Sequence, residues 1–167
     1  MINNSTQALQ NFLNENKFDA NIQDETEQVY TILKINQKEY PLFLRVFDQG
    51  HLLQLLAFIP CYLKPSQQET DPSQKQLLGD LARLLHLLNK ELDMPGFGMD
   101  EMAGVVFYRL MLPTPVKKVE GDLLLAFMRT IEHVCKIFSP PIEALSAGQM
   151  TLDQILEKAQ ELDKPES

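Results

Sequence analysis

The spacing of hydrophobic and polar positions changes along the chain, and each change predicts a different element. Near the start, Leu9, Phe12 and Leu13 stand at helical spacing, and Asn4 or Ser5 can cap the first turn. This pattern predicts a helix over residues 4–16. The polar stretch that follows, residues 19–26, predicts a loop.

After that loop the period shortens to that of strands. Gln28–Ile35, Tyr40–Phe47 and His51–Ile59 are rich in β-branched, aromatic and leucine residues. Short polar turns at residues 36–39 and 48–50 separate them. Connections this short predict a meander of three antiparallel strands.

The second half alternates helices with one hairpin. Asp71 before Pro72 predicts the cap of a helix that runs to about Leu92. Residues 97–100 and 105–112 then predict two strands, and residues 122–138 predict a third helix. At residues 139–141 a Ser-Pro-Pro stretch ends or kinks that helix.

A capping box from Thr151 to Gln154 predicts a short last helix. The resulting order is α-βββ-α-ββ-α with an extra C-terminal helix. Strands and helices are segregated, which indicates an α+β fold whose antiparallel sheet is covered by helices on one face. We expect a single α+β domain over residues 1–147 and an amphipathic helix and tail over residues 148–167.

Alternation along the strands divides their side chains between two faces. One set is almost uniformly apolar and should pack under the helices: Val29, Leu33, Ile35, Leu42, Leu44, Val46, Leu53, Leu55, Ile59, Val106, Tyr108, Leu110 and Leu112. The other set is also largely apolar, with a few charges: Tyr30, Ile32, Lys34, Phe43, Arg45, Phe47, Leu52, Gln54, Leu56, Phe58, Val105, Phe107, Arg109 and Met111.

The second set is unusual, because a sheet face that meets water should alternate with polar residues. At about 25 cal/mol per Å² such a surface is costly to leave wet, so something should cover it. The cover is the protein's own first or last helix, a second copy of the chain, or an extended partner segment. We nominate these residues for partner binding: Leu9, Phe12, Tyr30, Ile32, Phe43, Arg45, Phe47, Leu56, Phe58, Phe107, Arg109 and Met111.

Two of these residues are charges among aromatics, and two interpretations stay open. Arg45 and Arg109 either lie at the rim of the face, with their stems over apolar surface, or pair with acidic groups of a bound peptide. The 167 residues include 15 Lys and Arg against 23 Asp and Glu, a net charge of -8. An acidic protein repels phosphate backbones, so we expect no nucleic-acid partner.

Catalytic and metal-binding motifs were not found in the sequence. It has no nucleotide-binding, nucleophile-elbow or zinc-protease motif, and its single G-x-G at Gly96 and Gly98 is explained by turn chemistry. His133, with Glu132 and Cys135, does not form a convergent ligand set. We therefore expect no enzyme activity, no cofactor and no metal. The alternative of a small-ligand pocket would use Tyr108, His86 and His133.

The two cysteines and the lack of long apolar runs bear on location. Cys61 and Cys135 both lie in apolar surroundings and outside any CxxC spacing, so we interpret them as reduced and buried. No apolar run approaches the roughly 18 residues of a membrane span. We expect a cytoplasmic protein without membrane insertion.

One stretch resembles a known family. A leucine-rich helix from Leu81 ends in Leu88-Asn89, a loop with Gly96-Phe97-Gly98 follows, and after an acidic turn a strand runs from Gly104 to Leu112-Pro113. A third amphipathic helix comes next. This arrangement resembles YbjN-like proteins and, beyond them, the Tir-chaperone (CesT-like) class of bacterial type III secretion chaperones, over roughly residues 4–145.

The resemblance implies a small acidic cytosolic protein, usually dimeric and without enzymatic activity, with an α-βββ-α-ββ-α fold. In the secretion chaperones, unfolded effector segments wrap around apolar patches of the first helix and the strands. Two features depart from the pattern: the long insertion at residues 60–72, and the last helix, which could occupy a client groove. No family residue carries over by identity.

The leading hypothesis is therefore a non-enzymatic protein-binding module that holds an extended segment of a partner, such as a secreted effector, on an apolar sheet and helix surface. A homodimer is expected. The alternatives are a YbjN-like protein of unknown role whose sheet is covered by its own helix, and a small-ligand-binding protein.

Overall fold

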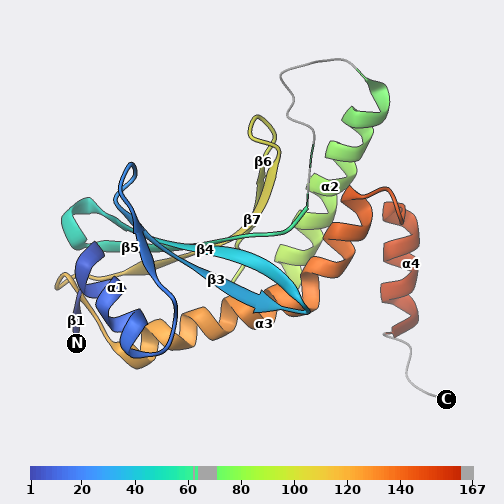
Figure 1. Ribbon diagram of the computed structural model, residues 1–167. Helices are drawn as coiled ribbons and strands as arrows, with labels where there is room; N and C mark the ends of the chain where they lie inside the picture. The colour runs from blue at the N-terminus through green and yellow to red at the C-terminus, as the bar shows by residue number, and fades with distance from the viewer. Residues whose placement is uncertain (62, 64–70, 163–167) are drawn as a thin grey trace.

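The computed structural model describes residues 1–61, 63 and 71–162. Its main layer is a six-stranded antiparallel sheet of order β2-β3-β4-β5-β7-β6, and a second, two-stranded sheet joins β1 to β8. Figure 1 shows α1 and the long α3 on one side of the main sheet, with α2 and α4 beyond its end. The expected α+β architecture is confirmed.

The N-terminal part has two short strands that the sequence pattern did not predict. Helix α1 spans Thr6–Glu15, and the Ser5 hydroxyl caps it by accepting from the Ala8 N–H. Strand β1 (Ile2–Asn3) pairs with β8 (Lys118–Val119), and β2 (Asn21–Gln23) pairs with β3 inside the stretch expected to be a loop. Strand β2 is a short polar edge strand, so it lacks a run of alternating apolar residues.

The central meander is confirmed. Strands β3 (Gln28–Ile35), β4 (Lys38–Phe47) and β5 (Leu52–Phe58) pair in sequence as antiparallel neighbours. Both residues of the β3–β4 turn have positive φ, 51° at Asn36 and 64° at Gln37, as a tight hairpin between twisted strands requires. A short 3₁₀ turn, η1 (Asp48–Gly50), connects β4 to β5.

The second helix and hairpin are also confirmed. Helix α2 spans Pro72–Glu91, and the Asp71 carboxylate accepts from the Ser73 N–H at 3.0 Å. Strand β6 covers Phe97–Asp100 and β7 covers Val105–Pro113. Because β7 also pairs with β5, the hairpin completes the sheet on that side.

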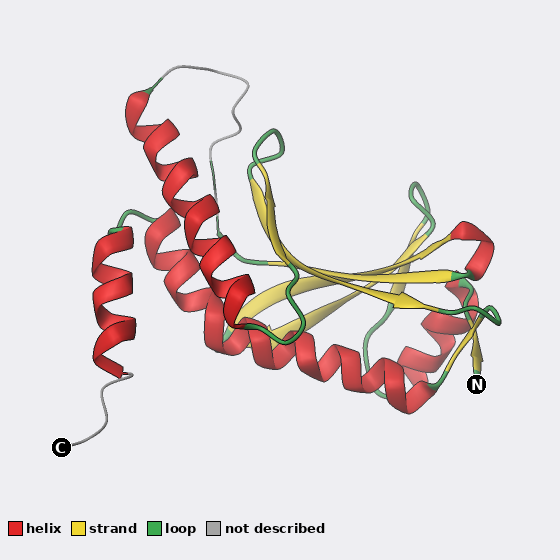
Figure 2. Ribbon diagram, turned by 180° about the vertical axis from the view of Figure 1, so that it is seen from behind, coloured by secondary structure: helices red, strands yellow, loops and turns green. Residues whose placement is uncertain are grey.

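Helix α3 (Gly121–Ser146) continues through the Ser-Pro-Pro stretch, which therefore kinks the helix and does not end it. Pro140 has no N–H for the Lys136 carbonyl one turn earlier. The Asn36 side chain, in the β3–β4 turn, donates to that carbonyl at 3.4 Å, and the Ser139 hydroxyl donates to the Cys135 carbonyl at 2.5 Å. Figures 1 and 2 show the helix running along the sheet and then turning beside α2.

The last helix, α4 (Leu152–Leu162), begins with the expected capping box. The Thr151 N–H donates to the Gln154 side chain and the Gln154 N–H donates to the Thr151 hydroxyl. Leu152 and Ile155 are buried, and α4 lies against α2. Among the described residues, a single hydrophobic core joins the inner face of the sheet to side chains of all four helices, α1 to α4.

Candidate functional site

One face of the main sheet is packed and the other is uncovered. In the set expected under the helices, every residue except the half-buried Val46 is buried. The opposite set, which we call the open face, is partly or fully exposed throughout: Tyr30, Ile32, Lys34, Phe43, Arg45, Phe47, Leu52, Gln54, Leu56, Phe58, Val105, Phe107, Arg109 and Met111.

No described helix covers the open face. Helices α1 and α3 contact the sheet from the core side, α2 contacts the edge strand β6, and α4 contacts α2. Figures 1 and 2 agree that the β2–β3 and β6–β7 hairpin tips rise on the side away from α3, and that α2, which rises on the same side, stands beyond the end of the sheet and not over it. Of the three alternatives for the cover, the first or last helix is therefore excluded for the described chain, because both helices use their apolar sides elsewhere.

Aromatic side chains form the middle of the open face. Phe43 is next to Tyr30, with ring centroids 6.0 Å apart, and meets Phe58 edge to face at 5.6 Å. In the strand register Phe43 lies opposite Leu56, and Phe58 lies opposite Phe107. These neighbours belong to four adjacent strands, so the apolar surface is continuous across the centre of the sheet.

Two arginines stand on this surface, each beside an aromatic ring of its own strand. The guanidinium carbon of Arg45 lies 4.6 Å from the Phe47 ring centroid, and that of Arg109 lies 5.6 Å from the Phe107 centroid. These distances allow cation–π attraction. Both arginines are exposed, and no described residue forms an ion pair with either one. Their charges are therefore available to a second molecule.

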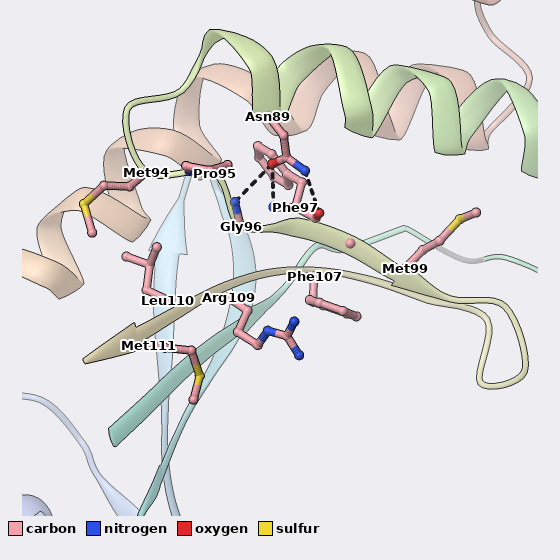
Figure 3. Close-up of a pocket in the computed structure, with 11 residues that line it drawn as sticks. Asn89, Met94, Pro95, Gly96, Phe97, Met99, Phe107, Arg109, Leu110 and Met111 are labelled. Carbon is pink, nitrogen blue, oxygen red and sulfur yellow. Dashed lines mark hydrogen bonds between the residues drawn. The ribbon is translucent and has the colours of Figure 1, made fainter. Parts of the chain in front are cut away.

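A recess of about 520 Å³ lies at the rim of the open face, beside β6 and β7. The Asn89 side chain fixes its wall: it accepts from the Gly96 and Phe97 N–H groups at 3.0 and 2.8 Å and donates to the Phe97 carbonyl at 2.9 Å. Figure 3 shows this clamp above β7, with Phe107, Arg109 and Met111 pointing to the other side of that strand.

The loop before β6 approaches β7 very closely. A Cβ at Gly96 would lie 2.3 Å from the Arg109 carbonyl oxygen, so only glycine fits there. The Arg109 N–H donates to the Gly96 carbonyl at 2.9 Å. The G-x-G stretch is therefore explained by close packing, in line with the turn interpretation of the sequence.

The structure brings together ten of the twelve nominated residues. These ten lie on the open face: Tyr30, Ile32, Phe43, Arg45, Phe47, Leu56, Phe58, Phe107, Arg109 and Met111. The other two lie on the core side of α1. Leu9 is 0% exposed, and Phe12 is half-buried beside Gly121. Leu9 is thus part of the core and is not accessible to a partner in this fold.

Sequence reasoning missed the residues that shape the recess, namely Asn89, Met94 and Pro95. An asparagine in the last turn of a helix, followed by a Pro-Gly pair, is a signal for side-chain capping of a loop. It does not indicate which backbone groups are bound, so the recess could not be located from that signal alone.

The groups considered for a small-ligand pocket do not converge. The Tyr108 hydroxyl donates to the Met94 carbonyl at 2.6 Å, whereas His86 on α2 and His133 on α3 are exposed. Within residues 1–61, 63 and 71–162, no three His, Cys, Asp or Glu side chains are grouped so that they could hold a metal ion. Burial raises the pKa of the free Cys135 thiol to about 12, so this thiol is unreactive at neutral pH.

A second polar cluster lies where α3 kinks. The Tyr40 hydroxyl is 2.5 Å from the Ser139 hydroxyl and donates to the Glu143 carboxylate at 3.1 Å, and Lys38 forms an ion pair with Glu143. Burial is the main cause that raises the pKa of Tyr40 to about 12. These contacts fasten β4 to the kinked part of α3, which is a structural role.

Comparison with known proteins identifies the family. Residues 5–144 match the family model "YbjN: Putative bacterial sensory transduction regulator". The chain belongs to the YbjN family. No curated protein matches the sequence. Among the described helices, none is long and apolar enough to cross a membrane.

A solved structure agrees with this fold. The chain is similar to "Crystal structure of YbjN, a putative transcription regulator from E. coli", with a TM-score of 0.56, 14% identity, and coverage of 88% of this chain and 94% of that one. At this identity the likeness establishes the YbjN fold alone. A chain of "Structure of the HopA1-SchA Chaperone-Effector Complex" gives a TM-score of 0.45 at 20% identity, covering 79% and 90%. No conclusion about this YbjN-family protein follows from a likeness of that degree.

Proposed function

We propose that this protein is a non-enzymatic protein-binding module that holds an extended segment of another polypeptide on its open face. The observation that carries the proposal is the uncovered, largely apolar far side of a sheet whose near side is already sealed by α1 and α3. An antiparallel sheet that only meets water alternates apolar and polar residues, and this one does not.

The construction of the face supports binding. Its central residues Phe43, Leu56 and Phe107 stand on β4, β5 and β7, which are interior strands of the sheet and are backed by buried leucines. A rigid platform of this kind loses little conformational freedom when a segment docks on it. Apolar contact supplies affinity there, because each Å² removed from water contributes about 25 cal/mol.

A second copy of the chain is the other occupant to consider, since a homodimer is expected from the family resemblance. The charges of the open face argue against symmetric self-docking. Lys34, Arg45 and Arg109 point to this side, whereas the carboxylates of the same strand faces, Glu39 and Asp100, lie towards the ends of β4 and β6. We therefore propose a different polypeptide as the partner and a cytoplasmic setting for the contact.

A capture experiment with matched variants tests the proposal. Leu56→Asp places a charge in the middle of the open face, and Ile137→Asp places one on an exposed apolar residue of α3, outside it. Proteins retained from a native extract by the wild type and by Ile137→Asp, and lost with Leu56→Asp, support the proposal. Equal retention by both variants, with both folded by circular dichroism, contradicts it.

A further inference from the structure

The two arginines of the open face stand on either side of one apolar residue. In the strand register, Arg45 of β4 lies opposite Gln54 of β5, and Gln54 lies opposite Met111 of β7. Two residues along, Leu56 lies opposite Arg109. Arg45 and Arg109 are therefore placed diagonally across β5, with Leu56 and Gln54 between them.

The register fixes the separation of the arginine backbones. Neighbouring strands lie about 4.8 Å apart and residues rise about 3.4 Å each, so two strands across and two residues along give about 12 Å between the two Cα atoms. Each guanidinium lies beside a ring two residues away on its own strand, that of Arg45 beside Phe47 and that of Arg109 beside Phe107. In the register these rings lie opposite Leu52 and Phe58, towards the two ends of β5, so the two side chains lean away from each other. The two guanidinium groups therefore lie farther apart than the backbones.

An extended polypeptide offers same-side residues at matching intervals. Alternate side chains point to one side, and residues four apart are separated by about 13 Å and residues six apart by about 20 Å. An odd spacing turns the second side chain to the opposite side. Two acidic residues separated by four or six positions can thus reach Arg45 and Arg109 together, while an apolar residue between them rests on Leu56.

The charge of the molecule makes these sites selective. The chain has a net charge of -8, yet the two arginines of the open face have no described carboxylate partner. Cation–π attraction to a neighbouring ring favours one position of each guanidinium, and a planar guanidinium binds a carboxylate through two parallel hydrogen bonds. Negative potential elsewhere on the surface repels an acidic segment that lands away from this face.

The geometry points to an extended acidic segment as the partner, with carboxylates four or six positions apart and an apolar residue between them, crossing β4, β5 and β7 diagonally. This inference rests on the proposed function and names the chemistry of the segment. The carboxylates bind Arg45 and Arg109, and the apolar residue packs on Leu56 and Phe43.

Synthetic peptides test the spacing directly. Fluorescein-labelled peptides of about a dozen residues carry two glutamates four, five or six positions apart. A leucine stands between the two glutamates, at a position that points to the same side as the first one, and Ser or Thr fills the other positions. Fluorescence anisotropy with the full chain should give tighter binding for the even spacings, roughly tenfold over the odd one, because the odd spacing turns one glutamate away from its arginine and loses a charge-assisted hydrogen bond. Equal affinity at all three spacings overturns the inference.

Charge reversal supplies the matched controls. Arg109→Glu should abolish binding of the acidic peptides. The same variant should bind a peptide in which lysine replaces the glutamate that faces position 109. Arg83→Glu makes the same charge change on an exposed position of α2 and should leave affinity unchanged. Both arginines of the site are exposed, so these variants are expected to fold, as a melting curve can verify.

The outcomes separate this inference from the proposed function. If Leu56→Asp removes binding of a leucine-rich peptide while Arg45→Glu and Arg109→Glu have no effect, the face binds protein but not through acidic residues, and the inference fails alone. If Leu56→Asp also has no effect on any peptide, the proposed function fails as well. Binding of a labelled oligouridine that competes with the peptides contradicts a protein partner.

Discussion

Arg109 lies directly opposite Leu56 in the register of β7 and β5, so a charged and an apolar side chain share the centre of the open face. The two neighbours of Leu56 along its strand, Leu55 and Ala57, are both 0% exposed on the other side of the sheet. One strand thus stabilises the fold with one set of side chains and presents the other set outward.

This division gives a stability prediction from adjacent residues. Leu55→Ala removes a fully buried side chain and should lower the free energy of unfolding by about 2–5 kcal/mol. Leu56→Ala truncates a partly exposed residue of the open face and should cost about 1 kcal/mol or less. Urea unfolding measures both. Similar losses for the two variants would mean that the open face is packed.

The close approach of Gly96 to β7 gives a second prediction. Gly96→Ala brings a Cβ against the Arg109 carbonyl and should destabilise the protein by about 1–3 kcal/mol. Gly79 lies inside α2, and an added methyl group there would meet no neighbouring side chain or element within 4 Å, so Gly79→Ala should stabilise the protein by about 0.5–1 kcal/mol. Thermal unfolding of the two variants should therefore shift in opposite directions. Two shifts of the same sign would contradict this account of the recess.

Stability should also depend on alkaline pH through Tyr40. Burial raises the pKa of its phenol from 10.0 to about 12, so the folded state favours the protonated form. The resulting stability is complete below about pH 10 and is lost as the pH rises through 12. The urea midpoint should fall between pH 9 and pH 11, and less steeply in Tyr40→Phe. An identical pH dependence in both proteins would contradict the burial of this group.

The last helix should be dispensable for binding. We propose that residues 148–167 form an appendage to the domain of residues 1–147, because α4 lies on α2 and away from the open face. Deleting residues 149–167 exposes the α2 surface that Leu152 and Ile155 cover, so the melting temperature should fall. Affinity for the acidic peptides should stay the same. A gain in affinity on deletion would show instead that the tail competes for the face.

Much of this architecture follows from local patterns in the sequence. Alternate side chains of a strand point to opposite faces, so dividing residues 28–35 and 105–112 into odd and even positions separated the two faces correctly, and burial alternates along β3 and β7 accordingly. The capping signals at Asp71 and Thr151 located two helix starts, since a side-chain cap is a contact between near neighbours.

The features that were missed depend on contacts between distant residues. Strand β2 is too short for a period, and it forms through pairing with Tyr30 and Val29. Past Pro140, the Lys136 carbonyl that has no helical N–H partner accepts from the side chain of Asn36, about a hundred positions earlier. Leu9 was assigned to the binding surface because its pattern shows an apolar helix face but not which side of the sheet that face meets.

Site-specific photocrosslinking tests the central claim most directly. A benzoylphenylalanine at position 43 lies in the middle of the open face, and one at position 137 lies on the outer side of α3. After irradiation in the native cells, the protein labelled at Phe43 should form an adduct with a different polypeptide, and the protein labelled at Ile137 should not. No adduct at Phe43, equal adducts at both positions, or an adduct only with a second copy of the chain would contradict the account.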